Sequence, residues 1–158
     1  MMDQRHALCV SAAVLLFSIG CSPAERGDSG EIETAGSVDA FKMQVGDCFD
    51  DQTAFSDEVS DVPGVPCASP HDNEVFATFD VSENEWPGED QLNELANEGC
   101  LDRFEAAIGA TYDESVLMFT TLIPSKGSWG QRADREVVCA AYHMELEKLT
   151  GTVLNSGR

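Results

Sequence analysis

The chain has 158 residues, and Asp and Glu outnumber Lys and Arg by 29 to 9, which gives a formal net charge of −20 at pH 7. A negative field of this size repels phosphate, and no basic patch interleaved with aromatic residues offsets it, so we expect no nucleic acid partner. The length suits a single folded domain. No motif calls for a cofactor, and we expect none.

The first residues have the pattern of an export signal. Thirteen mostly apolar residues, Ala7–Ile19, form a run that is shorter than the roughly 20 apolar residues of a membrane-spanning helix. The run is followed by Gly20-Cys21, which resembles the cleavage motif of bacterial lipoprotein signals. We therefore predict a lipoprotein signal peptide over residues 1–20 and acyl chains on Cys21, which would hold the protein on the extracytoplasmic face of the cell membrane. The alternative is simple secretion with an unmodified thiol.

Residues 21–40 have a composition typical of a linker. Ser, Gly, Ala, Glu, Asp and Thr dominate, and Ile32 and Val38 are the only large apolar side chains. Such a segment buries too little surface to offset the entropy lost when it is ordered. We predict a flexible tether that holds the folded domain, residues 41–151, about 25 Å from the lipid on average.

A cluster of acidic residues lies near the start of the folded domain. Its members are Asp47, Asp50, Asp51, Asp57, Glu58 and Asp61. Because no Asp-x-Asp-x-Asp-Gly calcium loop is present, we interpret the cluster as a solvated face and keep a specific cation site as an alternative.

The clearest element is a helix over residues 89–108. Apolar residues recur every three or four positions and form one stripe, which contains Leu92, Leu95, Ala96, Cys100, Phe104 and Ile108. Glu89 and Asp90 suit the first turn, and Gly109 is a natural stop. Gly99 weakens the helix, which indicates a close packing contact or a break there.

Several β-like runs accompany the helix, at residues 74–79, 115–123 and 136–143, with a possible short strand at 45–49. We expect a loop at residues 124–130 and a frayed C-terminus over residues 152–158. These elements predict an α+β fold in which a small, disulfide-crosslinked antiparallel sheet packs against one helix.

Four cysteines fall within the predicted domain, namely Cys48, Cys67, Cys100 and Cys139. An even number of cysteines in an exported chain indicates a disulfide framework, and four cysteines allow three pairings. We favour Cys48 with Cys67 and Cys100 with Cys139, because a local closure followed by a helix-to-strand crosslink is the simplest topology. A zinc site is the alternative, but no Cys-x-x-Cys pair is present.

Several short motifs follow one another in a characteristic order. They are Val45–Asp50, Val65–Val75 with its Cys-x-x-Pro-His-x-x-Glu-Val pattern, Trp86–Gly88, Cys100, and Pro124–Cys139. This order, which extends over about residues 41–151, resembles the septum formation domain family of actinobacterial exported and membrane proteins. The resemblance implies a role in cell division or in the cell envelope, and it supplies no established reaction.

The most reactive-looking group consists of His71, Asp72 and Glu74. A histidine with a carboxylate three positions on can ligate a metal or act as a general base, and Asp72 can orient the imidazole. The structural interpretation is a turn in which these side chains bind backbone groups. We favour the turn, because a catalytic metal needs a third ligand that only distant His143 or an acidic residue could supply. We therefore assign no catalytic residue and no metal ligand.

Trp86 and Trp129 lie in predicted loops. Exposed aromatic residues on a rigid scaffold bind peptides or glycans, whereas buried ones would close the small core. We keep both tryptophans as possible binding residues, together with His71, Asp72 and Glu74.

The leading hypothesis is a lipid-anchored, non-enzymatic extracytoplasmic domain that binds an envelope or division protein or a wall ligand. The first alternative is a metal-dependent envelope hydrolase that uses His71 and Glu74. A second alternative is a sensor that binds cations or small ligands at the acidic face.

Overall fold

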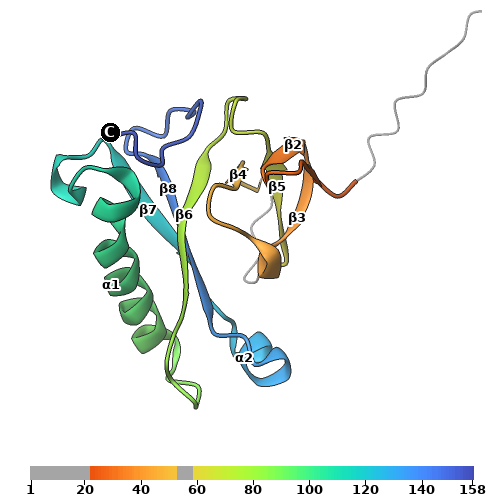
Figure 1. Ribbon diagram of the computed structural model, residues 1–158. Helices are drawn as coiled ribbons and strands as arrows, with labels where there is room; N and C mark the ends of the chain where they lie inside the picture. Colours follow the sequence, from red (N-terminus) through yellow and green to blue (C-terminus); the bar gives the residue numbers. More distant parts are fainter. Residues whose placement is uncertain (1–21, 53–58) are drawn as a thin grey trace, which may run out of the picture.

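The computed structural model describes residues 22–52 and 59–158, so the predicted signal peptide and Cys21 lie outside the described residues. The strands are β1 (Glu25–Arg26), β2 (Ile32–Thr34), β3 (Gly36–Asp39), β4 (Cys48–Phe49), β5 (Asp61–Val65), β6 (Asn73–Asp80), β7 (Leu117–Leu122) and β8 (Glu136–His143) (Figure 1). The helices are α1 (Glu89–Ile108) and α2 (Lys126–Arg132), and the short 3₁₀ turns are η1 (Ala40–Lys42) and η2 (Tyr112–Glu114). The predicted α+β class, with an antiparallel sheet and one packed helix, is confirmed.

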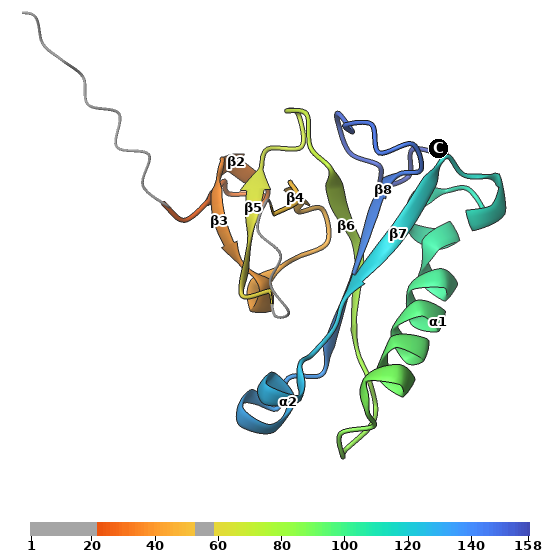
Figure 2. The ribbon, with the colours of Figure 1, turned by 180° about the vertical axis from the view of Figure 1, so that it is seen from behind.

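The larger sheet has six strands in the order β3-β5-β4-β6-β8-β7, and each strand is antiparallel to its neighbours. Its centre is the long pair β6 and β8, whose register shifts between Val75 and Ala77. Figure 2 shows α1 alongside β6, β8 and β7, while β1 to β5 form the other half of the molecule. The sheet thus joins a helix-covered half to a half built of strands.

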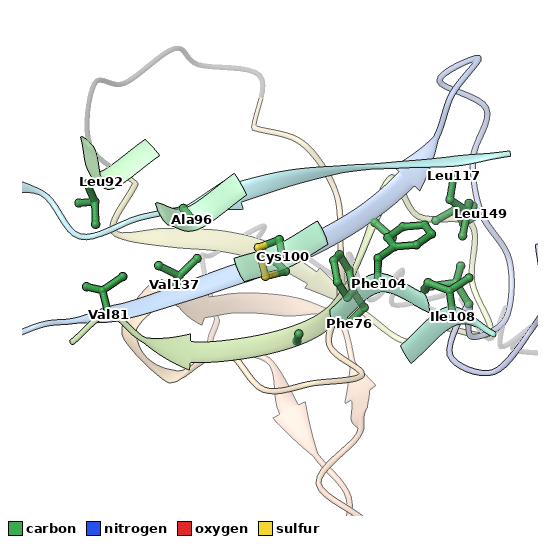
Figure 3. Close-up of a cluster of buried hydrophobic side chains, with 14 of the residues drawn as sticks. Phe76, Val81, Leu92, Ala96, Cys100, Phe104, Ile108, Leu117, Val137 and Leu149 are labelled. Carbon is green, nitrogen blue, oxygen red and sulfur yellow. A yellow bond between two sulfur atoms is a disulfide. The ribbon is translucent and has the colours of Figure 1, made fainter. Parts of the chain in front are cut away.

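Helix α1 supplies the main hydrophobic core. Its bounds agree with the prediction, and the predicted stripe is buried except for Leu95, which is partly buried. The Phe104 ring meets the Phe76 ring of β6 edge-on, with 5.5 Å between the ring centroids (Figure 3). Gly109 ends the helix with a left-handed φ of 89°. The amphipathic pattern was sufficient to place this element.

The glycine within α1 marks a close contact and not a break. A Cβ atom at Gly99 would overlap the ring of Phe79, which lies on β6. The guanidinium of Arg103, one turn further along the helix, covers the same ring at 4.2 Å from its centroid. The first of the two predicted interpretations of Gly99 is therefore confirmed.

The predicted flexible tether is wrong for the part of residues 21–40 that the structure describes. Strand β3 pairs with β5 from Gly36 to Asp39, and β2 pairs with β1 in a separate two-stranded sheet. Ile32 and Val38, the two apolar residues of the supposed linker, are 5% and 6% exposed. Two side chains suffice here because a strand needs only one buried residue in every two.

Those two side chains belong to a second core. Its other buried members are Met43, Phe49, Val62, Val75, Val138 and Ala140. Val138 and Ala140 alternate along β8 with Val137 and Cys139 of the first core. The second core therefore lies on the face of the sheet away from α1.

The predicted frayed C-terminus is also wrong. Val153 is fully buried, and its N–H donates to a Glu74 carboxylate oxygen at 2.6 Å. The Thr152 hydroxyl donates to the other oxygen at 2.5 Å, and the N–H of Gly157 binds the carbonyl of Ile108 at 2.9 Å. Hydrogen bonds to distant residues order this polar segment, and no periodicity in its sequence indicates them.

The loop predicted at residues 124–130 is wrong from Lys126 onward, where α2 begins. The helix starts with a reciprocal cap, because the Ser125 hydroxyl accepts the Ser128 N–H at 3.0 Å and the Ser128 hydroxyl accepts the Ser125 N–H at 3.0 Å. Two glycines in the segment concealed this signal.

Strand β5 was not predicted, because it contains Pro63-Gly64, a pair typical of turns. The Pro63 carbonyl accepts the N–H of Asp50, and a Cβ at Gly64 would overlap the side chain of Val38. Glycine permits the close approach of β3 at this position.

The favoured disulfide pairing is confirmed. Cys48 and Cys67, whose Cα atoms are 5.2 Å apart, join β4 to the segment that follows β5. Cys100 and Cys139, at 5.6 Å, join α1 to β8 within the main core (Figure 3). Within residues 22–52 and 59–158, we find no helix with the length and apolar character needed to cross a bilayer.

Candidate binding site

An open pocket of about 330 Å³ lies where β4, β6 and β8 meet at one end of the sheet. Its lining combines three carboxylates with two hydroxyl groups, an amide, an imidazole and one apolar side chain. The lining residues are Asp51, Asp72, Asn73, Thr120, Tyr142, His143, Leu146 and Glu147. Because β4, β6 and β8 are adjacent and antiparallel, the end of β4, the start of β6 and the end of β8 come together here.

Charged hydrogen bonds hold one wall of the pocket in place. The Lys148 ammonium lies 2.8 Å from a carboxylate oxygen of Asp50 and 2.8 Å from one of Asp72. The N–H of Asp51 donates to Asp72 at 2.9 Å, and the Asn73 amide donates to Asp51 at 2.8 Å. The segment after β4 is thereby fixed to the start of β6, so this wall is formed in advance of any ligand.

The same contacts keep Asp72 ionised at neutral pH. Burial works to raise the pKa of Asp72, but hydrogen bonds from Lys148 and from the Asp51 N–H outweigh it and leave the pKa below its usual value. Hydrogen bonds to Asp50 and Asp72 in turn raise the pKa of Lys148. The wall therefore carries fixed negative charge that one lysine only partly compensates.

One exposed apolar residue, Leu146, lines the pocket and has an unusual backbone conformation. Leu146 is 79% exposed and has a φ of 57°, in the left-handed region that a branched side chain seldom adopts. Val116, Met118 and Met144 are also exposed; Met118 lies on β7 opposite Tyr142, while Val116 precedes β7 and Met144 follows β8. The N–H of Leu146 donates to the carbonyl of His143 at 2.8 Å, so this residue closes the turn after β8 and leaves its side chain in solvent beside the pocket.

His143 lines the pocket from the end of β8. Its Nδ1 accepts the N–H of Glu145 at 3.2 Å, so the neutral ring carries its proton on Nε2. The imidazole can therefore donate a hydrogen bond to a ligand.

His71 and Glu74 are not on this surface, since both are fully buried. His71 Nδ1 donates to the Ser69 carbonyl at 2.8 Å, and the backbone of His71 pairs with Leu149. Glu74 binds Thr152 and Val153, as described above. Of the three residues predicted together, only Asp72 reaches the pocket.

The two tryptophans close the core and are poorly placed for binding. Trp129 is 5% exposed and lies in α2, and Trp86 is half-buried against it with 5.4 Å between the ring centroids. The Arg135 guanidinium covers the Trp129 ring at 3.6 Å from its centroid. Of the two interpretations that the sequence left open for Trp129, the structure supports the one in which the ring closes the core.

The acidic cluster is not one solvated face. Asp47 is 2% exposed and forms a two-pronged ion pair with Arg26, at 2.5 and 2.7 Å. Asp50 pairs with Lys148 and Asp51 lines the pocket, whereas Asp61 is exposed. Asp57 and Glu58 lie outside the described residues.

Sequence reasoning missed the half of the pocket that β7 and the turn after β8 contribute. Thr120, Tyr142, Leu146 and Glu147 are polar or exposed, and they belong to no motif. Thr120 on β7 and Tyr142 on β8 alternate with residues of the main core. This alternation predicts that each side chain lies on the face of the sheet away from that core. The pairing of β6 with β8 places Tyr142 opposite Asn73, next to Asp72, and the pairing of β7 with β8 adds Thr120.

Comparison with known proteins gives one result. Residues 45–156, which span β4 to the C-terminal segment and include every residue of the pocket, match the family described as Septum formation. No curated protein and no solved structure gave a significant match. Because the match covers more than two thirds of the chain, the protein belongs to the septum formation family.

Proposed function

We propose that the protein is a lipid-anchored, extracytoplasmic binding module, without enzymatic activity, which uses the open pocket to hold a basic segment of an envelope or division protein. The observation that carries the proposal is the convergence of Asp51, Asp72 and Glu147 on one pocket that the exposed side chain of Leu146 also lines. Membership of the septum formation family supports a role in cell division or in the envelope.

The chemistry of the pocket favours a lysine or arginine side chain as guest. Such a side chain combines a cationic head with an aliphatic stem. Its head would bind the carboxylates by charge-assisted hydrogen bonds, and its stem would lie against Tyr142 and Leu146. Lys148 already makes this kind of contact with Asp72 at the same wall. The net charge of −20 also attracts basic partners over longer distances.

Binding is favoured over catalysis by what the pocket contains. Neither serine nor cysteine is among its lining residues, and the hydroxyl of Thr120 has no hydrogen bond to the His143 imidazole among the described residues, so the pocket shows no nucleophile paired with a base. The alternative of a hydrolase at His71 and Glu74 is disfavoured because both side chains have no exposed surface through which a substrate could reach them.

Photo-crosslinking in cells of the native host tests this proposal. A benzophenone amino acid at Leu146 is expected to form an adduct with one envelope or division protein through a basic segment, identified by mass spectrometry. The matched control carries the probe at Leu101, which is 49% exposed on α1, the helix on the other side of the sheet. Changing Asp51→Asn together with Glu147→Gln in the probe protein should reduce the adduct at least about tenfold, because each lost charge-assisted bond contributes about 1.5–3 kcal/mol.

Three outcomes would contradict the proposal. The first is that both probe positions give the same adducts. The second is that the double change leaves the adduct intact, and the third is that the adduct forms with glycan or lipid in place of protein.

The start of the fold bears on the proposed anchor at Cys21. The carbonyl of Ser22 accepts the N–H of Ser37 at 2.9 Å, and the N–H of Ala24 donates to the Ser37 carbonyl at 2.9 Å. Among the described residues, the chain is therefore hydrogen-bonded into the fold from Ser22, the residue after Cys21. An acylated Cys21 would hold the domain directly against the bilayer, in place of the 25 Å separation expected for a tether.

Intact mass of the protein purified from membranes tests the anchor. The expected mass is that of residues 21–158 with acyl chains, less four hydrogens for the two disulfides, and Cys21→Ala should release the protein from the membrane fraction. Recovery of an unmodified Cys21 from correctly exported protein would exclude lipid anchoring, without bearing on the pocket.

A further inference from the structure

We propose that Cys48, His71 and Glu74 form a zinc site that becomes available when the Cys48–Cys67 disulfide is reduced. The Cys48 sulfur, an imidazole nitrogen of His71 and a carboxylate oxygen of Glu74 all lie within 4.8 Å of one another. None of the three side chains has exposed surface. The site is independent of the pocket and of its proposed ligand.

The spacing of the three groups is close to what zinc requires. Sulfur, nitrogen and oxygen ligands of a tetrahedral zinc ion lie about 2.0–2.3 Å from the metal and so about 3.3–3.8 Å from one another. Side-chain movements of about 1 Å would bring the present separations into this range. The three residues come from the start of β4, the turn before β6 and β6 itself, which neighbouring strand pairs and the His71–Leu149 bridge hold together.

His71 has the hydrogen-bond arrangement of a metal ligand. Its Nδ1 donates to the Ser69 carbonyl at 2.8 Å, and a carbonyl can only accept, so the neutral ring has its lone pair on Nε2. Nε2 is buried and has no hydrogen-bond partner among the described residues. Metal-bound histidines characteristically donate their other ring N–H to a backbone carbonyl or a carboxylate in this way.

Glu74 is a buried carboxylate without a cationic partner in the described part of the chain. Its hydrogen-bond donors, the Thr152 hydroxyl and the Val153 N–H, are both neutral. The ion pairs of the described residues involve other carboxylates. A divalent cation beside Glu74 would supply the compensating charge.

The two cysteines have different roles in this proposal. Only a thiolate binds zinc well, so the disulfide keeps Cys48 out of coordination. Cys67 is partly exposed and is not one of the three mutually close ligands, whereas Cys48 is fully buried among them. Cys67 therefore blocks the site when it is bonded to Cys48.

A dithiol reductant would open the site by thiol–disulfide exchange. Its thiolate attacks the Cys67 sulfur and forms a new S–S bond there, and Cys48 leaves with the bonding electron pair as a thiolate. The second thiol of the reductant then displaces Cys67 as a thiol, so the reductant ends as a disulfide. The Cys48 thiolate, Nε2 of His71 and the Glu74 carboxylate would bind Zn²⁺, with a fourth position left for water.

Two single substitutions in the full chain test the proposal, since both remove the same disulfide. Cys67→Ser keeps the Cys48 thiol beside His71 and Glu74. Cys48→Ser removes that sulfur ligand and keeps only the Cys67 thiol, which is not one of the three mutually close ligands. After incubation with Zn²⁺ and desalting, Cys67→Ser should retain one zinc ion per chain and Cys48→Ser none. With Co²⁺, only Cys67→Ser should show a thiolate-to-cobalt charge-transfer band, and adding His71→Gln should abolish it.

The wild-type protein provides a second measurement that does not depend on the variants folding. After reduction by a phosphine, Zn²⁺ should protect Cys48 from alkylation by iodoacetamide and leave Cys67 reactive, as mapped by mass spectrometry. Equal zinc retention by the two variants, or equal alkylation of Cys48 with and without Zn²⁺, would overturn the proposal. Stoichiometric zinc binding by the oxidised protein would overturn the role given to the disulfide.

Discussion

Glu74 is an acidic side chain with no exposed surface, and two hydrogen bonds from the C-terminal segment hold its carboxyl group. Leaving a buried polar group of this kind without its partners costs about 1–3 kcal/mol or more. The geometry explains why the chain after Leu149 folds back onto β6. A residue that looked reactive in sequence is, in the oxidised protein, the point where the C-terminal segment attaches.

Replacing Thr152 measures the strength of this attachment. We expect Thr152→Ala to lower the free energy of unfolding by about 1.5–3 kcal/mol, because it removes a hydrogen bond to a charged group. Thr152→Ser, which keeps the hydroxyl, should cost less than about 1 kcal/mol. Urea denaturation of the two variants compares them, and equal losses would show that the hydroxyl does not matter.

Two of the helical glycines, Gly99 and Gly130, make a second matched pair. Gly99→Ala gains helix propensity of about 1 kcal/mol but drives a methyl group into Phe79, at an overpacking cost of about 1–3 kcal/mol. A Cβ atom at Gly130, in α2, would meet nothing within 4 Å, so alanine there gains propensity without a clash. Thermal unfolding should show a lower Tm for Gly99→Ala and a higher Tm for Gly130→Ala. A stabilised Gly99→Ala would mean that Phe79 can move away at little cost.

At the scale of elements, local sequence patterns predicted the helix and strands whose apolar residues recur with a regular period. Helix α1 and the strands β6, β7 and β8 carry enough periodicity to be found, and the disulfides between Cys48 and Cys67 and between Cys100 and Cys139 followed from topology. Strands β2, β3 and β5 were missed, because each is short and rich in polar residues, Gly or Pro. These strands form because they pair with residues distant in the sequence, and local composition does not reveal such pairing.

The second core distinguishes an ordered N-terminal segment from a tether. We expect Val38→Ala to lower the free energy of unfolding by about 1–3 kcal/mol, because it removes buried methyl groups from β3. Val45→Ala, at a position 52% exposed, should change it by less than about 0.5 kcal/mol. Chemical denaturation monitored by tryptophan fluorescence compares the two, and an unchanged midpoint for Val38→Ala would restore the tether.

The candidate site followed the same limits as the fold. Asp72 was kept as a possible binding residue because it lies in a motif, whereas Asp51 was grouped with an acidic cluster that we interpreted as a solvated face. No pattern in the chain indicated that the two share a pocket with Thr120 and Glu147. Burial separated His71 and Glu74 from Asp72, although the three lie within four positions. Alternation between the two faces of a sheet holds only within a regular strand. His71 and Asp72 lie in the turn before β6, so alternation along the strand does not predict where their side chains point.

At the scale of the whole molecule, negative charge dominates, and Glu136 is one place where it works against folding. Burial, followed by the nearby charges of Asp80 and Asp134, raises the pKa of Glu136. A carboxyl group with a raised pKa favours the folded state when protonated, so its contribution to stability falls as pH rises through its folded pKa. Asp72, whose pKa is lowered, has the opposite effect, and its contribution is lost as pH falls through its folded pKa.

A neutral replacement should therefore stabilise the protein in a pH-dependent way. We expect Glu136→Gln to raise the free energy of unfolding by up to about 1 kcal/mol at pH 7. The difference should vanish below the usual pKa of a glutamate, where the wild-type side chain is also neutral. Urea titrations at several pH values follow this trend, and a gain that persists in acid would point to packing as its cause.

The position of Thr152 and Val153 in the chain has a consequence for biogenesis. Polypeptides are made, and threaded through membranes, from the N-terminus onward, so the Glu74 carboxylate exists long before its two donors do. Until then, burying the Glu74 side chain leaves it without these two partners, which is unfavourable. We therefore expect the sheet around β6 to reach its final packing only after synthesis has passed Val153, and its cysteines to stay accessible to pairing enzymes until that point.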